Sequence, residues 1–189
     1  QEENTLRVEV DNSVNDRVYP QKADFTFYGG IYRDVEYLIV PKEHFDLDYC
    51  GSSGIKVTPA VDLSRKSACV TVETWQNAPE VTICVDGQTK TVASVDGHAA
   101  AEFVIEHVHL WDGLEDPYLY TATATLPSGD MVSARFGCRH FEIDPQKGFI
   151  LNGKSYPLRG VSRHQDYKDV GNALTMEHHR QDMEIIKDL

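Results

Sequence analysis

Residues 68–92 read ACVTVETWQNAPEVTICVDGQTKTV, and their apolar side chains recur at every second position. This period of two predicts β-strands with one buried face, because successive side chains of a strand point to opposite faces. Asn77-Ala78-Pro79 interrupts the pattern, and Asp86-Gly87 is a typical two-residue hairpin turn. The stretch therefore predicts three short strands. They span residues 68–74, 80–85 and 90–92.

The same pattern extends on both sides of this stretch. Pro59 cannot donate a backbone hydrogen bond, which favours an edge strand or a bulge. Residues 127–130 (PSGD) form a turn by composition. Strands spaced by about ten residues, with no helix between them, are typical of an antiparallel β-sandwich. The stretch 53–142 suits a seven-stranded, immunoglobulin-like domain of about 100 residues. The further strands are predicted at residues 55–61, 101–108, 119–126 and 131–136.

A sandwich of this kind needs an apolar core formed by the inward-facing positions of its strands. Truncating a fully buried core residue to Ala is expected to cost about 2–5 kcal/mol. Cys69 and Cys84 lie too close in sequence for the inter-sheet disulfide of immunoglobulin domains, so no disulfide is predicted. The alternation predicts these core residues: Val57, Val61, Val70, Val72, Val81, Ile83, Phe103, Ile105, Leu119 and Phe136.

The pattern changes after Phe141. Asn152-Gly153 is a strong hairpin signal between two apolar runs, 149–151 and 156–158. Residues 158–161 (LRGV) predict a short buried strand, and Thr175 can cap a following helix. The apolar face of that helix contains Met176, His179, Met183 and Ile186.

A strand followed by a helix is the opening of an α/β unit, and one such unit cannot cover its own sheet edge. The N-terminal region has alternating residues at 6–10 and an apolar run at 37–40, which predict two or three strands, too few for an independent sheet. We therefore expect one complete central domain with a partial domain on each side.

Composition narrows the functional classes. The 189 residues include 18 Lys and Arg and 30 Asp and Glu, so the net charge is 18 − 30 = −12. An acidic chain argues against nucleic acid and anionic membranes as partners, since both attract basic surfaces. No apolar run approaches the roughly 20 residues of a membrane span, and no signal peptide is visible. The four cysteines predict buried, reduced thiols, which favours the cytoplasm.

Five short motifs follow one another in a fixed order. Their sequence and order resemble glycoside hydrolase family 2, the β-galactosidase and β-glucuronidase group. Leu110-Trp111 with Pro117-Tyr118-Leu119-Tyr120 is similar to the family's W…P-x-L-Y signature, and Phe136-Gly137-Cys138-Arg139 is similar to its F-G-x-R. The first of the other three motifs combines residues 4–12 with residues 30–35. The remaining two lie at residues 149–153 and at residues 158–164.

The resemblance implies three regions. Residues 1–45 correspond to the end of the sugar-binding jelly roll, 46–142 to the immunoglobulin-like β-sandwich, and 143–189 to the first strand and helix of the catalytic (β/α)8 barrel. The fold class is therefore mainly β.

The resemblance also implies an activity for the longer parent protein, the retaining hydrolysis of terminal β-D-galactosides. Retention requires two carboxylates about 5 Å apart. In the family both are glutamates on later barrel strands, so no catalytic residue is assigned here and the chain alone is expected to be inactive. A free-standing β-sandwich that binds carbohydrate or protein is the alternative function.

By the same resemblance, three residues of this chain contact the sugar: His164, Arg163 and Asp24. His164 and Arg163 would project from the C-terminal end of the first barrel strand, where barrel enzymes build their sites. Asp24 matches an aspartate that reaches toward the sugar and a bound sodium. The parent would thus take sodium or magnesium, with no cofactor or metal assigned to this chain itself.

Each candidate has a structural alternative. Arg163 is equally suited to pair with a barrel carboxylate, and Asp24 to be an ordinary loop residue. His107 and His109 share one strand face without an evident third metal ligand, which favours a polar face. Trp111 is expected to serve in packing rather than sugar stacking.

Assembly is the last expectation. The apolar runs 37–40 and 149–151 would present unpaired edges, which are templates for association. We expect them either to pack back onto the sandwich or to form a homo-oligomer.

Overall fold

The computed structural model describes residues 5–17 and 27–189. The chain divides into two compact units, one of residues 38–158 and one that combines residues 1–37 with 159–189. The boundaries predicted after residues 45 and 142 remain predictions.

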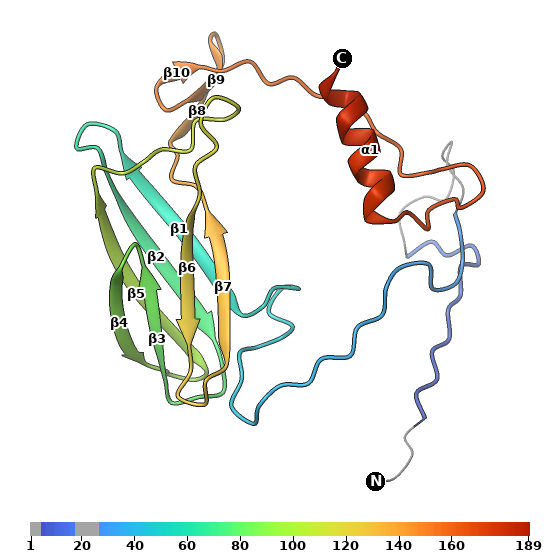
Figure 1. The fold of residues 1–189 in the computed structure, drawn as a ribbon, viewed down its shortest axis with the longest axis horizontal. Coiled ribbons are helices and arrows are strands. Elements are labelled where there is room, and N and C mark those ends of the chain that lie inside the picture. Colours follow the sequence, from blue (N-terminus) through green and yellow to red (C-terminus); the bar gives the residue numbers. More distant parts are fainter. Residues whose placement is uncertain (1–4, 18–26) are drawn as a thin grey trace. The chain divides into compact units, whose positions relative to one another are not determined.

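The unit of residues 38–158 is built on a seven-stranded antiparallel sandwich, as the alternation predicted (Figure 1). One sheet has three strands in the order β1-β2-β5, and the other has four in the order β4-β3-β6-β7. In the first sheet the strands are β1 (Ile55–Asp62), β2 (Ser67–Trp75) and β5 (His98–Glu106). In the second they are β3 (Glu80–Val85), β4 (Gln88–Ala93), β6 (Tyr120–Thr125) and β7 (Met131–Phe136).

Turn chemistry fixes the register of the strands. Asp86 and Gly87 have φ of 48° and 74°, the left-handed pair that a tight hairpin between β3 and β4 requires. Pro59 lies on β1, an edge strand, where its missing N–H costs no central ladder bond. The predicted turn at 127–130 joins β6 to β7, and the Leu126 N–H donates to Asp130 O at 2.9 Å.

The core lies between the two sheets, where most of the predicted residues are buried. Val57 and Val61 are only partly buried because β1 is an edge strand. Leu119 is half-buried, and the prediction that it belongs to the core is wrong. The strand begins one residue later, so Tyr120 faces inward instead and its hydroxyl accepts the His109 N–H at 2.8 Å. A shift of one residue exchanges the two faces of a strand.

The cysteines are all free, but the expectation that they are buried holds only for Cys138. Burial raises the pKa of the Cys138 thiol to about 11, which keeps it protonated and unreactive. Cys69 is exposed because Val70, the next residue, takes the inward position on β2.

A third sheet of three short strands follows the sandwich in the same unit (Figure 1). The strands are β8 (Phe141–Asp144), β9 (Gly148–Leu151) and β10 (Lys154–Ser155). Asn152 and Gly153 have φ of 50° and 80°, which confirms the predicted hairpin. Asn152 also joins this sheet to the sandwich, because its side-chain amide donates to Trp111 O at 3.0 Å.

Trp111 serves in packing, as expected. The Trp111 N–H donates to Cys138 O at 2.8 Å, and the Arg139 guanidinium carbon lies 5.2 Å from the centroid of the indole ring. This distance is typical of a cation–π contact. The two sequence signatures W…P-x-L-Y and F-G-x-R thus meet at one end of the sandwich.

In the other unit the one helix of the described residues is α1 (Met176–Lys187), capped by Thr175 as predicted. Across both units, no strand forms at 6–10, 37–40 or 158–161 in the described part of the chain, which corrects the sequence prediction. A strand needs a hydrogen-bonded neighbour, and these segments have none there. Their apolar side chains are therefore exposed, as in Leu6, Ile39 and Val161.

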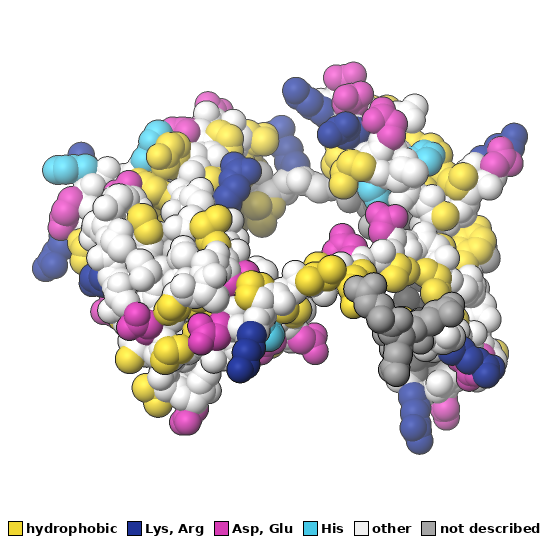
Figure 2. All heavy atoms as spheres, turned by 60° about the horizontal axis from the view of Figure 1, so that its bottom comes forward, with side chains coloured by type: hydrophobic (Ala, Val, Ile, Leu, Met, Phe, Trp, Pro, Cys, Tyr) yellow, Lys and Arg dark blue, Asp and Glu magenta, His cyan; other side chains and the backbone are white. Residues whose placement is uncertain are grey.

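No described helix is both long and apolar enough to cross a bilayer. Figure 2 shows hydrophobic, acidic and basic side chains interspersed over the sandwich on the face that it presents.

Candidate functional site

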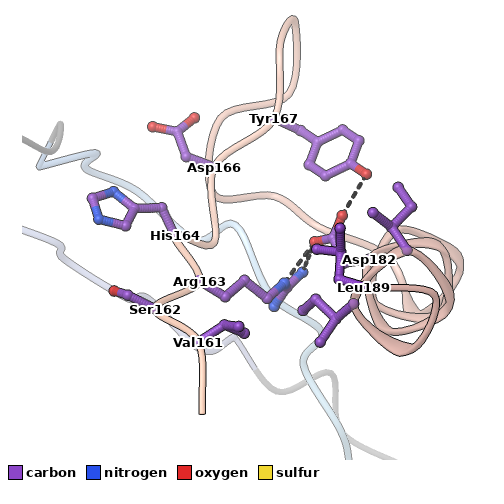
Figure 3. Close-up of a pocket in the computed structure, with 10 residues that line it drawn as sticks. Val161, Ser162, Arg163, His164, Asp166, Tyr167, Asp182 and Leu189 are labelled. Atoms are coloured by element: carbon purple, nitrogen blue, oxygen red, sulfur yellow. Dashed lines mark hydrogen bonds and ion pairs between the residues drawn. The ribbon is translucent and has the colours of Figure 1, made fainter. Parts of the chain in front are cut away.

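Two of the three residues predicted to contact sugar, Arg163 and His164, line a hollow beside α1, in the unit of residues 1–37 and 159–189. A hollow of about 360 Å³ lies between the segment 161–167 and this helix (Figure 3). Its lining residues are Val161, Ser162, Arg163, His164, Asp166, Tyr167, Asp182, Ile185, Ile186 and Leu189. Apolar and charged groups therefore share one surface.

Arg163 points to the helix and pairs with Asp182. The Arg163 Nε–H donates to Asp182 Oδ2 at 2.6 Å, and Arg163 Nη2 contacts the same oxygen. Both side chains are largely covered, with 18% and 17% exposed. The structural alternative for Arg163 was a pair with a barrel carboxylate, and the structure pairs it with the carboxylate of Asp182 on α1.

Tyr167 completes the group from the other end of the segment. Its hydroxyl donates to Asp182 Oδ1 at 2.7 Å, so both oxygens of the carboxylate are engaged. The hydrogen bonds from Tyr167 and Arg163 hold the pKa of Asp182 below its ordinary value. The same bond to Asp182 raises the pKa of Tyr167. At neutral pH the carboxylate is therefore charged and the phenol is protonated.

His164 lies between these two anchors and points away from Asp182, as do Ser162 and Asp166 (Figure 3). All three are exposed, whereas Arg163 and Tyr167 are half-buried. The segment thus presents an imidazole, a hydroxyl and a carboxylate on the side opposite the helix. These are donors and acceptors that suit the hydroxyl groups of a sugar.

Further contacts hold this segment within its unit. The Tyr167 N–H donates to Gly171 O at 3.1 Å, and the Tyr167 ring meets the His178 ring at 4.7 Å between centroids. His178 Nδ1 in turn accepts the N–H of Thr175, the helix cap, at 3.0 Å. The position of Tyr167 is therefore tied to the first turn of α1.

The remaining sequence candidates do not join this group in the described structure. Asp24 lies outside the described residues. His109 Nε2 lies 2.6 Å from Asp116 Oδ2, and its ring stacks on Tyr118 at 4.0 Å. Within residues 5–17 and 27–189, no group of three or more His, Cys, Asp or Glu side chains is arranged to hold a metal ion.

Sequence reasoning missed the roles of Tyr167 and Asp182. Asp182 lies 19 positions from Arg163, and the sequence did not indicate which carboxylate would pair with that arginine. The one available hint was that Arg163 is suited to pair with a barrel carboxylate. The pairing becomes visible only when the segment and the helix lie side by side.

Comparison with known proteins agrees with the sandwich and the motif order. The sequence model of the glycosyl hydrolases family 2 matches residues 42–139, over half of the chain. A β-glucuronidase of Bacteroides fragilis is 35% identical over an alignment that covers 100% of this chain and 30% of that protein. A β-galactosidase of Staphylococcus xylosus is 28% identical, with 99% of this chain and 18% of that protein covered.

Solved structures show the same relation. The FMN-binding β-glucuronidase of Faecalibacterium prausnitzii L2-6 matches with a TM-score of 0.80 and 37% identity, over 93% of this chain and 29% of that one. A Bacteroides uniformis β-glucuronidase 2 matches with a TM-score of 0.76 and 34% identity, over 94% of this chain and 24% of that one. The architecture is that of a glycosidase with a β-sandwich domain. The chain belongs to glycosyl hydrolases family 2, and it spans 30% or less of the length of these relatives.

Proposed function

We propose that the protein to which this chain belongs is a retaining β-glycosidase that removes a terminal β-D-glucuronide. The observation that carries this proposal is the sequence similarity to β-glucuronidases, at 35% identity over 100% of this chain for one relative and 37% over 93% for a solved structure. The β-galactosidases of Staphylococcus xylosus and Bacteroides ovatus are 28% and 26% identical, and the solved structure of a putative β-galactosidase of Bacteroides fragilis is 33% identical over a shorter part, 77%, of this chain.

In this proposal the chain supplies part of the sugar site. His164 donates a hydrogen bond to a sugar hydroxyl, and its exposure on the side away from α1 favours that role. Arg163 is engaged with Asp182, which favours a positioning role for it over direct sugar contact. Asp24 stays a candidate contact.

The chemical step requires two carboxylates about 5 Å apart, one as acid and base and one as nucleophile. We assign neither to this chain, in keeping with the family pattern that puts both glutamates on later barrel strands. The chain by itself is therefore expected to bind or position a sugar and to leave its glycosidic bond intact. Sodium or magnesium remains a proposal for the whole protein, and no step is assigned to it.

A β-D-galactoside is the second candidate substrate. Asp24 and the run Arg163-His164-Gln165-Asp166 favour it by their resemblance to β-galactosidases. The engagement of Arg163 with Asp182 weakens this argument, because an arginine held in that way is less available to a sugar.

The test compares 4-nitrophenyl β-D-glucuronide with 4-nitrophenyl β-D-galactoside as substrates of the full-length protein. We expect kcat/KM to favour the glucuronide and the first product, followed by NMR, to keep the β configuration. A preference for the galactoside would establish the second candidate. Hydrolysis of neither substrate, with saccharide binding by the chain alone, would support a free-standing binding module.

A further inference from the structure

One carboxylate holds both ends of the segment that carries His164. Asp182 lies on α1, and each of its oxygens accepts a hydrogen bond from a different residue. Oδ2 accepts from Arg163 Nε at 2.6 Å, and Oδ1 accepts from the Tyr167 hydroxyl at 2.7 Å. The donors lie one position before and three positions after His164, so the histidine is held between two fixed points.

Because side chains alternate along this segment, anchoring Arg163 also determines the side to which His164 points. Arg163 and Tyr167 point toward the helix, whereas His164 and Asp166 point away from it (Figure 3). In an extended segment adjacent side chains point to opposite sides. Fixing Arg163 to the helix therefore fixes the side on which the imidazole projects.

The surroundings make the anchor strong. The side chains of the arginine and the aspartate are each more than four-fifths covered. Charge-assisted hydrogen bonds are stronger where water has less access to the paired groups. Lysine cannot reproduce the contact, because it lacks the planar fork with which Arg163 approaches the carboxylate.

We propose that Asp182 is a positioning residue for sugar recognition, acting through Arg163 and Tyr167 on the orientation of His164. This inference rests on the proposed function, since it assumes that His164 contacts the substrate. Asp182 itself touches neither sugar nor reacting bond. Its role is to keep the imidazole at the distance and angle at which it donates to a sugar hydroxyl.

The decisive experiment is a double-mutant cycle in the full-length enzyme. Asp182→Asn removes the charge and half of the acceptor capacity while preserving the side-chain volume. We expect it to lower kcat/KM about 10- to 100-fold, mainly through KM, since a small displacement of a contacting group has effects of that size. In a His164→Ala background the same substitution should change kcat/KM by less than about twofold.

Two further variants separate positioning from folding. Tyr167→Phe keeps the ring against His178 and loses only the hydroxyl, so we expect a smaller loss of about three- to tenfold with an unchanged melting temperature. Glu184→Gln removes an equal charge from an exposed position of the same helix, and it should leave kcat/KM unchanged.

The outcomes are distinct. An equal loss from Asp182→Asn in both backgrounds would overturn the inference, because Asp182 would then act independently of His164. Unchanged kcat/KM in both Asp182→Asn and Tyr167→Phe would overturn it too. Failure of the unsubstituted enzyme to hydrolyse either glycoside would instead refute the proposed function, and the inference with it.

Discussion

Gly137 leaves the space that the side chain of Trp111 occupies at one end of the sandwich. A Cβ at Gly137 would lie 2.8 Å from Cβ of Trp111, closer than real Cβ atoms approach, and 3.0 Å from its Cγ. Gly137→Ala must therefore push Trp111 away from the Arg139 guanidinium and from Cys138. We expect a loss of about 1–3 kcal/mol in the free energy of unfolding.

Urea unfolding followed by tryptophan fluorescence measures this loss, because both tryptophans of the chain, Trp75 and Trp111, lie in the unit of residues 38–158. Ser133→Ala, at an exposed position of β7, serves as the control and should change the value by less than about 0.5 kcal/mol. Equal midpoints for the two variants would show that Trp111 adjusts without cost.

At the residue scale, the stability contributed by the Asp182 carboxylate depends on pH. Its pKa is lowered, first by the Tyr167 hydroxyl and then by Arg163, so the charged form is the one that the folded chain stabilises. That stabilisation is complete above the ordinary value of 3.8 and is lost as the pH falls through the lower value of the folded chain. NMR titration of the Asp182 carboxyl carbon should therefore give a midpoint below 3.8.

Tyr167→Phe should raise that midpoint toward the ordinary value, because it removes the largest cause of the shift. An unchanged midpoint would mean that Arg163 alone holds the carboxylate, and Tyr167 would lose its assigned part in the anchor.

At the scale of elements, valine substitutions can compare how much the inward and outward faces of the sandwich strands contribute to stability. Val70 on β2 is 0% exposed and Val104 on β5 is 51% exposed. Val70→Ala should destabilise the sandwich by about 2–3 kcal/mol, the sum of lost burial and a cavity. Val104→Ala should cost less than about 0.5 kcal/mol, and urea unfolding measures both. Similar losses at the two sites would contradict the observed register.

The sandwich was predictable because its signals are local and repeated. Period-two patterning, Asp86-Gly87 and Asn152-Gly153 specify strands and turns within a few residues of themselves, and all of them appear in the structure. Leu119 was misplaced because two apolar residues, Leu119 and Tyr120, adjoin at a strand start. There the alternation does not distinguish the inward residue from its neighbour.

Predictions that depend on distant partners failed or stayed incomplete. The strands expected at 6–10, 37–40 and 158–161 do not form in the described residues, since a local pattern cannot supply the neighbouring strand that a sheet requires. The site shows the same division. His164 and Arg163 were found from their place in a motif, whereas Asp182 and Tyr167 acquire their roles only through contacts made on folding.

At the scale of the whole molecule, the exposed apolar run 37–40 leads to a prediction about assembly. Tyr37 is 90% exposed, Leu38 60% and Ile39 86%, so these side chains are largely uncovered in the described structure. The other run, 149–151, does pack in its own unit, because β9 pairs with β8 and β10 and Leu151 is 2% exposed. We therefore expect the 189-residue chain to self-associate through residues 37–40.

The net charge of −12 opposes that association, and salt should relieve the opposition. Sedimentation velocity at about 0.01 M and about 1 M salt, where the Debye length falls from about 30 Å to about 3 Å, should show more dimer at the higher concentration. Ile39→Lys should abolish the dimer, while Leu114→Lys, at a residue that is 91% exposed outside the run, should leave it intact. The reason is that a lysine in the middle of a buried apolar interface has no partner for its charge. Equal association of both variants would therefore exclude residues 37–40 as the contact.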